Sequence, residues 1–244
     1  MSHRYKLIGC EILFREVCMC AARSPNVIDP EFMPKGLHDL GEKNMTAQLQ
    51  ARIDAVDIER YEAILLCYGL CNYGTKGLSA NIPIVMPRAH DCITLLMGSK
   101  DKYKDYFFSN PGTLFMSSGW IERSKDPGAI ENSIPAKLGM RVDLEAYDEE
   151  DAAYIKEILG DWVRNYSKYA FIDNGTGVPP TYEEKVKAQA AEKNWRYERV
   201  AGDVRLIQNL MDGVWDSADI LYVPPMHRIT ATNEDTIVSC EQIV

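Results

Sequence analysis

The chain has 244 residues, 46% of them hydrophobic and 26% charged, so it can bury a sizeable core and is not composed like a disordered segment. Its 27 Lys and Arg against 36 Asp and Glu leave a net charge of −9, which argues against nucleic acid or an anionic membrane surface as a partner. No apolar run approaches the roughly 20 residues of a membrane span. The first residues show no signal-peptide pattern, so we expect a cytoplasmic protein.

The first part of the chain alternates short apolar runs with segments of helical periodicity, which is typical of repeated β-α units. The apolar runs predict strands at 5–10, 26–28, 63–67, 82–86 and 113–117. The periodic segments predict helices at 12–22, 44–56 and 90–97.

Residues 123–135 are rich in Pro, Gly, Asn and Ser, which indicates a linker or an excursion loop. Beyond it we expect helices at 148–163, 181–193 and 203–211, and strands at 169–173, 195–200 and 220–223. Ile237 and Val238 are strand-like and would add an edge.

These elements predict an α/β fold with a mainly parallel sheet flanked by helices. The chain divides into two similar halves, residues 1–122 and 136–244, joined by the 123–135 segment. The halves form one compact body or two lobes, and no residue-level repeat relates them.

The seven cysteines are the most informative part of the composition. An odd number of cysteines in a chain with no secretion signal is not a disulfide framework. The cysteines are therefore either buried small hydrophobic residues or chemically active groups.

Four of the cysteines follow strand ends. Cys10 ends the first predicted strand, Cys67 ends the third with Cys71 in the loop behind it, and Cys92 starts the helix after the fourth strand. Ligands of open α/β sheets bind outside the carboxyl ends of the strands. In the common strand order 2-1-3-4-5, these strands are neighbours and all four thiols meet at one rim.

Each cysteine also has a structural interpretation. Cys18 and Cys20 lie two residues apart in a helix and share no face, so packing explains them, and Cys240 lies near the C-terminus. A core role and a site role are about equally plausible for Cys67. Cys10, Cys71 and Cys92 are the best candidate metal ligands, although their spacing has no zinc-type CxxC knuckle. In the competing interpretation Cys92, at a helix N-terminus, is a thiolate nucleophile.

Two histidines lie near these cysteines. His90 is two residues from Cys92, and His38 lies in the Pro-rich loop after the second strand, so both are candidate acid–base groups or additional ligands. Taken alone, a loop histidine is more often an ordinary surface residue. His227 follows the last predicted strand and could face the same site from the second half.

Three further residues are candidate cofactor-binding groups. Gly69 and Gly74 follow a buried strand but match neither the dinucleotide fingerprint nor a P-loop, so an ordinary turn is the alternative. Arg88 would pair with an anionic ligand, or it is a solvated or capping arginine.

Several motifs together resemble the family known as domain of unknown function 1638. Two of them are specific: Tyr68-Gly69-Leu70-Cys71 with Gly74, and Pro87-Arg88-Ala89-His90-Asp91-Cys92-Ile93. Gly98-Ser99-Lys100 with Tyr103, and Pro111-Gly112-Thr113 with Gly119-Trp120, extend the resemblance along the chain. Met226 departs from the pattern, since a glycine is usual after the two prolines.

The resemblance implies a protein of anaerobic bacteria or archaea that accompanies corrinoid-dependent methyltransferase systems. A low-potential cytoplasm keeps thiols reduced, which favours a metal or cluster site over a disulfide.

Three hypotheses follow. The first is a metal- or iron–sulfur-binding protein of anaerobic one-carbon metabolism, with Cys10, Cys71 and Cys92 holding a cluster or a zinc, nickel or iron ion beside His90. A corrinoid protein or a methyltransferase would be its partner. The second is a metal-free small-molecule enzyme with a cysteine nucleophile and His90 as base. The third is a non-catalytic accessory protein that binds a cofactor or a methyltransferase. Metal analysis after anaerobic purification separates the first from the others.

Overall fold

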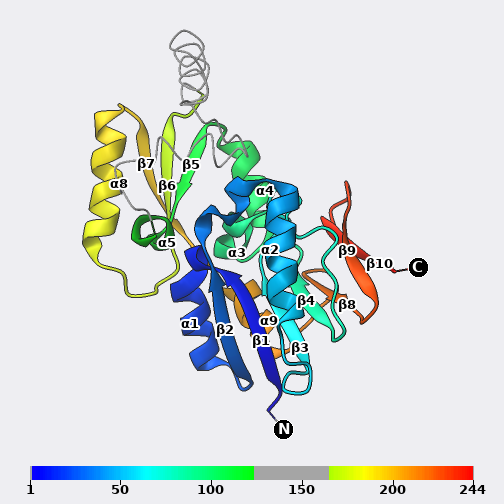
Figure 1. The fold of residues 1–244 in the computed structure, drawn as a ribbon. Coiled ribbons are helices and arrows are strands. Elements are labelled where there is room, and N and C mark those ends of the chain that lie inside the picture. The colour runs from blue at the N-terminus through cyan, green and yellow to red at the C-terminus, as the bar shows by residue number, and fades with distance from the viewer. Residues whose placement is uncertain (1, 124–164, 244) are drawn as a thin grey trace, which may run out of the picture.

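The structure is a computed structural model that describes residues 2–123 and 165–243 (Figure 1). The helix predicted at 148–163 and nearly all of the 123–135 segment lie outside the described residues.

The main sheet has five strands, of which the first four in spatial order are parallel and the last is antiparallel to its neighbour. In that order they are β2 (Val27–Met33), β1 (Arg4–Cys10), β3 (Ala63–Cys67), β4 (Ile84–Pro87) and β8 (Ile220–Val223). The predicted α/β class with a mainly parallel sheet is therefore confirmed.

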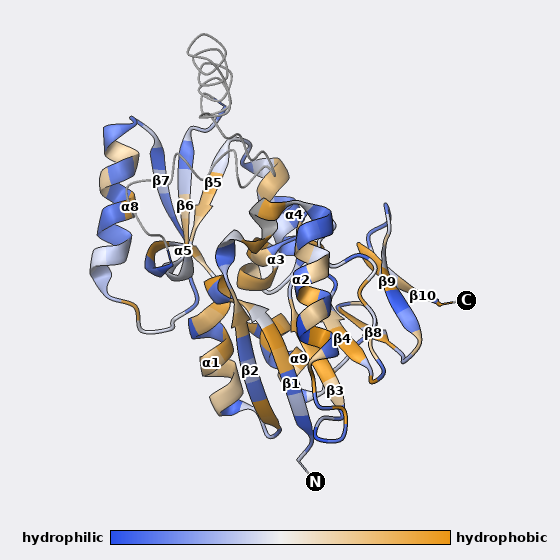
Figure 2. Cartoon of the chain, viewed as in Figure 1, coloured by the Kyte–Doolittle hydropathy of each residue, from blue (hydrophilic) through white to orange (hydrophobic). Residues whose placement is uncertain are grey.

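Helices cover both faces of this sheet: α1 (Phe14–Arg23), α2 (Glu42–Asp54), α3 (Cys92–Met97) and α9 (Arg205–Asp212). Alternate residues of β3 pack into two separate clusters: Ile64 lies with Leu49 of α2, and Leu65 lies with Val17 of α1 and Leu210 of α9. All five residues of β3 are buried, as expected for a strand covered on both faces. The hydrophobic colouring of β3 and β4 in Figure 2 reflects this double burial.

A second sheet has three parallel strands: β5 (Thr113–Met116), β6 (Lys168–Asp173) and β7 (Arg196–Ala201), in that order. Helix α8 (Pro180–Glu192) packs on β6 and β7, and the short helix α5 (Ser118–Glu122) follows β5. The C-terminal hairpin is a separate antiparallel pair, β9 (His227–Ala231) and β10 (Val238–Gln242).

Strand pairing crosses the predicted division of the chain. β5 comes from the first half but pairs with β6 of the second, whereas β8 of the second half pairs with β4 of the first. The strand order begins as expected with β2-β1-β3-β4, but the place beside β4 belongs to β8 rather than to the fifth strand. An apolar strand such as β5 buries its side chains equally well in either sheet, so its composition does not specify which strand it pairs with.

Other differences from the sequence prediction are local. Strand β2 extends to Met33 and includes Pro30. An edge strand pairs on one side only, so it tolerates a proline, which has no backbone N–H to donate. Helix α4 (Lys100–Ser109) and two 3-10 helices, η1 (Glu11–Leu13) and η2 (Lys35–Leu40), were not predicted. The strand-like tail forms β10 of the hairpin and not an edge of the main sheet.

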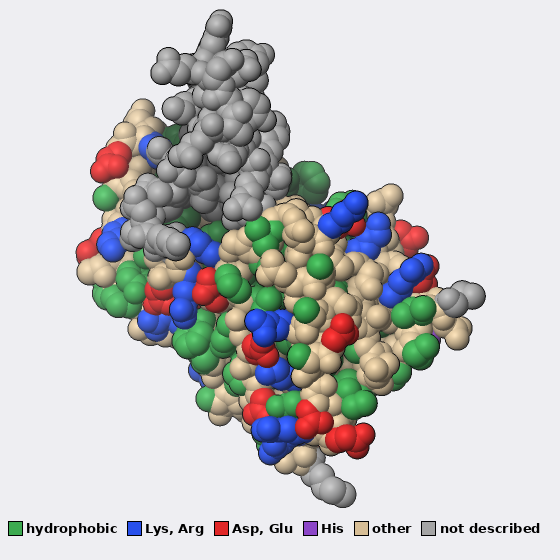
Figure 3. All heavy atoms as spheres, in the orientation of Figure 1, with side chains coloured by type: hydrophobic (Ala, Val, Ile, Leu, Met, Phe, Trp, Pro, Cys, Tyr) green, Lys and Arg blue, Asp and Glu red, His purple; other side chains and the backbone are tan. Residues whose placement is uncertain are grey.

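On the face shown in Figure 3, basic and acidic side chains are interspersed over the described surface. None of the helices in residues 2–123 and 165–243 combines the length and hydrophobicity that crossing a bilayer requires.

Helix α1 carries a buried carboxyl group, that of Glu16. Its side chain is 2% exposed and its Oε2 has no hydrogen-bond partner among the described residues. Burial raises the pKa of Glu16 to about 7, and the charges of Glu122 and Asp173 act in the same direction, against Arg15.

We expect the Glu16→Gln variant to be more stable than the wild type at pH 8 by about 2 kcal/mol and about equal to it at pH 5. Folding raises the pKa of the Glu16 carboxyl, so this group contributes fully to the stability of the fold below its pKa in the unfolded chain. That stability is lost as the pH rises through about 7, whereas the uncharged Gln does not titrate. Urea unfolding at both pH values measures the difference. Glu192→Gln, at an exposed position of α8, is the control, and an equal gain in that variant would contradict the interpretation.

Candidate functional site

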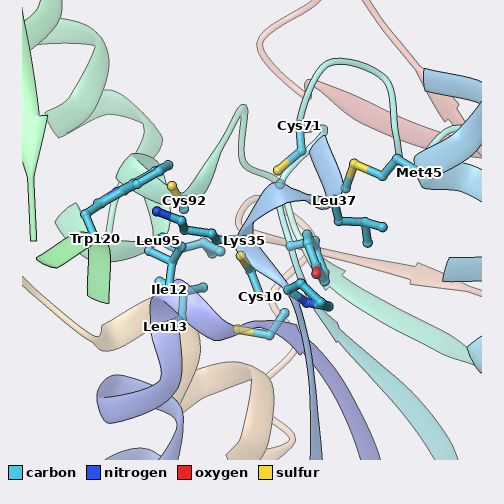
Figure 4. Close-up of a pocket in the computed structure, with 14 residues that line it drawn as sticks. Cys10, Ile12, Leu13, Lys35, Leu37, Met45, Cys71, Cys92, Leu95 and Trp120 are labelled. Carbon is cyan, nitrogen blue, oxygen red and sulfur yellow. The ribbon is translucent and has the colours of Figure 1, made fainter. Parts of the chain in front are cut away.

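Four cysteine side chains line one small cavity at the carboxyl end of the main sheet (Figure 4). They come from the last residues of β1 and β3, the turn behind β3 and the first residue of α3: Cys10, Cys67, Cys71 and Cys92. The cavity volume is about 30 Å³. β1, β3 and β4 are neighbours in the sheet, so the parallel topology is what brings these thiols together.

Among the other residues that line this thiol cavity the charged one is Lys35, the first residue of η2, and the mostly apolar wall also contains the polar groups of Tyr68 and Trp120. The Lys35 backbone N–H donates to Glu11 Oε1 at 2.8 Å, which ties the end of β2 to the end of β1. The Lys35 ammonium lies 6.0 Å from the centre of the Trp120 ring, and Figure 4 places both residues on the same side of the cavity as Cys92. Sequence reasoning missed Lys35, although its position directly after an edge strand at the same rim was a usable signal.

Burial governs the thiol chemistry of the cavity. It raises the pKa of Cys67, and it raises the pKa of Cys71, with the negative charge of Asp91 adding to the effect. The Tyr68 hydroxyl is buried without a hydrogen bond of ordinary geometry, and burial raises its pKa, with the Cys10 thiol close enough to contribute. Without a bound cation Cys67 and Cys71 are therefore protonated, and a cation would have to displace their protons.

Two backbone hydrogen bonds join the turn that carries Cys71 to the segment that carries Cys92. Leu70 N–H donates to Ala89 O at 2.8 Å, and Cys71 N–H donates to His90 O at 2.9 Å. Gly69 is needed for this approach, because a Cβ on it would lie 2.6 Å from the backbone nitrogen of Asp91. The structure thus gives Gly69 a packing role against backbone, whereas Gly74 packs against the flexible side chain of Met45.

A larger open cleft of about 680 Å³ adjoins the thiol cavity and shares Cys71, Cys92 and Trp120 with it. His90 lines this cleft but not the thiol cavity. His90 can therefore serve a molecule in the cleft as an acid–base group, beside the thiols.

The remaining histidines and cysteines named from the sequence differ in where they lie. The His227 ring contacts its neighbour Pro225 O at 3.0 Å and lines neither cavity. His38 lies within η2, and its side chain is outside what the structure describes. Cys20 is buried in α1 and burial raises its pKa to about 12, whereas Cys18 is exposed. Cys240 lies in the C-terminal hairpin.

Arg88 has a structural role that the sequence did not indicate. Its guanidinium donates to the backbone carbonyls of Ser217 at 2.8 Å, Thr236 at 3.3 Å and Val238. Arg88 lines neither cavity and instead fastens the C-terminal hairpin to the main sheet. The structure thus gives Arg88 a structural role, and the interpretation of Arg88 as a residue for an anionic ligand stays a prediction.

None of the seven cysteines, all within the described residues, forms a disulfide. Within residues 2–123 and 165–243, no group of three or more His, Cys, Asp or Glu side chains is arranged around a single metal-ion position. The structure thus brings Cys10, Cys71 and Cys92 to one cavity, and their role as ligands stays a prediction.

Comparisons with curated proteins and with solved structures gave no significant match. A family model, described as a protein of unknown function (DUF1638), matches residues 32–211. The matched region contains Cys71, His90 and Cys92, and Cys10 lies before it. Since the match covers well over half of the chain and includes both specific motifs of the site, this chain belongs to the DUF1638 family.

Proposed function

We propose that this protein binds an iron–sulfur cluster or a soft transition-metal ion, zinc, nickel or iron, through Cys10, Cys71 and Cys92. The observation that carries the proposal is the convergence of cysteines from three strand ends of one sheet on a single cavity. Thiolates are the ligands that iron–sulfur clusters and soft metal ions prefer. Three thiolates leave one coordination position open, as a catalytic or substrate-binding metal requires.

A cluster and a single ion make different demands on the thiols. The thiolates of a cluster bond different irons, so they stand farther apart than the ligands of one ion. The cysteines here surround a cavity, and no group in the described residues is already arranged around one ion position. A cavity of about 30 Å³ admits an ion directly, whereas a cluster would extend into the adjoining cleft, whose wall also contains Cys71 and Cys92.

Lys35 supports this assignment electrostatically. A cluster held by three thiolates carries negative charge, and burial of the thiols makes that charge costly. The Lys35 ammonium in the cavity wall would offset it. His90 would act as the acid–base group on the cleft side, and His38 remains the second candidate for that role.

A metal-free enzyme with Cys71 or Cys92 as nucleophile is the alternative, and the raised pKa of Cys71 counts against that thiol. The thiolate is the reactive form, and burial together with Asp91 raises the pKa of Cys71. A place in anaerobic corrinoid-dependent methyl transfer, with a corrinoid protein or methyltransferase as partner and a cytoplasmic location, is also part of the proposal. It is supported by the family resemblance alone.

We expect protein purified without oxygen to contain iron and acid-labile sulfide, or one of the other metals, and to lose most of it when Cys10, Cys71 or Cys92 is replaced by serine. The measurements are metal and sulfide analysis and the visible absorption spectrum. Cys240→Ser, in the hairpin outside the cavity, is the matched control and should keep its metal. Metal-free, colourless wild-type protein, or equal loss in the control, would contradict the proposal.

A further inference from the structure

The cleft beside the thiol cavity has aromatic walls. With a volume of about 680 Å³ it lies in the usual range for small-molecule sites. Its walls come from the turn behind β3, the start of α3, α4, β5, α5 and the residues just before β6. Six aromatic side chains line it: Tyr73, Tyr103, Phe107, Phe115, Trp120 and Tyr166.

The charge in this wall has one sign. Among the described lining residues Asp91 is the carboxylic acid, none is Lys or Arg, and the imidazole is that of His90. The Asp91 carboxylate accepts hydrogen bonds from the N–H groups of Ile93 at 3.0 Å and Thr94 at 3.1 Å. It also accepts one from the hydroxyl of Tyr103 at 3.2 Å. These bonds hold the carboxylate and one aromatic ring in fixed positions.

We propose that this cleft binds a small organic cation, an ammonium group carried on an apolar skeleton. Aromatic faces attract cations through their quadrupole, and the attraction is stronger where water is excluded. Asp91 adds a negative charge, whereas a phosphate or carboxylate ligand would meet no Arg or Lys partner in the described wall. The chemistry of the lining therefore selects cations over anions.

The turn that carries Tyr73 is already strained into position. Cys71, Asn72 and Tyr73 have φ values of 46°, 53° and 65°, the left-handed region that costs non-glycine residues roughly 1 kcal/mol each. In another part of the cleft wall, the Tyr103 and Phe107 rings meet edge to face with centroids 6.0 Å apart. Both walls are thus organised before a ligand arrives, which lowers the ordering cost of binding.

Cation binding and the thiol site can be tested separately. Cys10 lines the thiol cavity but not the cleft. Cys10→Ser should therefore lose metal and keep cation binding, so a failure of either proposal is seen without the other.

The probes are benzyltrimethylammonium, the neutral benzyl alcohol and the anionic benzoate, titrated calorimetrically into full-length protein at pH 8. We expect the cation to bind at least about tenfold more tightly than either other probe. Equal or tighter binding of benzyl alcohol or benzoate, or no binding of any probe, would overturn the proposal.

Two adjacent phenylalanines give a matched pair of variants. Phe107 lines the cleft, whereas Phe108 is 73% exposed and lies outside it. Phe107→Leu should weaken cation binding about threefold to tenfold, and Phe108→Leu should leave it unchanged. Asp91→Asn keeps a hydrogen-bond acceptor at the start of α3 and should weaken binding of the cation but not of benzyl alcohol. Equal effects of the Phe107 and Phe108 variants would contradict the assignment of the cleft.

Discussion

The Gly69→Ala variant is expected to lose about 3 kcal/mol of unfolding free energy and to lose the proposed metal site with it. A Cβ at this position would lie 2.6 Å from Asp91 N, 2.8 Å from His90 C and 2.9 Å from Ala89 O. All three atoms belong to backbone, so no side chain can rotate away to make room. The two segments would have to separate, which breaks the hydrogen bonds from Leu70 to Ala89 and from Cys71 to His90.

Urea unfolding and metal analysis of the same protein preparation measure both effects of Gly69→Ala. Gly175→Ala is the control: its Cβ would have open space around it, so only the positive φ of 66° contributes, about 1 kcal/mol. If Gly69→Ala were as mild as Gly175→Ala, the close approach of the two segments would not be what holds Cys71 and Cys92 together.

The second large effect is expected at Arg88. We expect Arg88→Met to lower the free energy of unfolding by about 3 kcal/mol, because the carbonyls of Ser217, Thr236 and Val238 would lose their shared donor. The C-terminal hairpin should also become sensitive to limited proteolysis. Arg88→Lys should recover only part of the loss, since one ammonium cannot reproduce the fork of a guanidinium.

Metal content distinguishes the two interpretations of Arg88. The structural role predicts that Arg88→Met keeps its metal under conditions where it is folded, because Arg88 lines neither cavity. A variant of unchanged stability that failed to bind metal or an anionic ligand would instead favour the interpretation of Arg88 as a ligand-binding residue.

The sites proposed here are neighbours with different chemistry. Cys71 and Cys92 lie in the wall of both the thiol cavity and the aromatic cleft. A cluster in the first would therefore face a cation in the second, and His90 lines the cleft beside them. This proximity follows from the hydrogen-bonded contact between the Cys71 turn and the His90 segment.

Periodicity and residue type were sufficient for much of this fold. The alternation of buried strands with amphipathic helices is encoded locally, so β1, β3, β6 and β8 lie close to where their apolar runs predict them. The carboxyl ends of parallel neighbours share one edge, so the positions of Cys10, Cys71 and Cys92 behind strands predicted their meeting.

The tertiary structure alone decided the rest, because it depends on contacts between distant segments. The exchange of β5 and β8 between sheets, the cation Lys35 in the thiol cavity and the aromatic cleft each join residues with no local sequence relationship. The same holds for Arg88, whose carbonyl partners lie about 130 to 150 residues further along the chain. Short-range patterns in the sequence thus determined the α/β class, and together with the common strand order they predicted the cysteine rim. Packing decided what surrounds that rim.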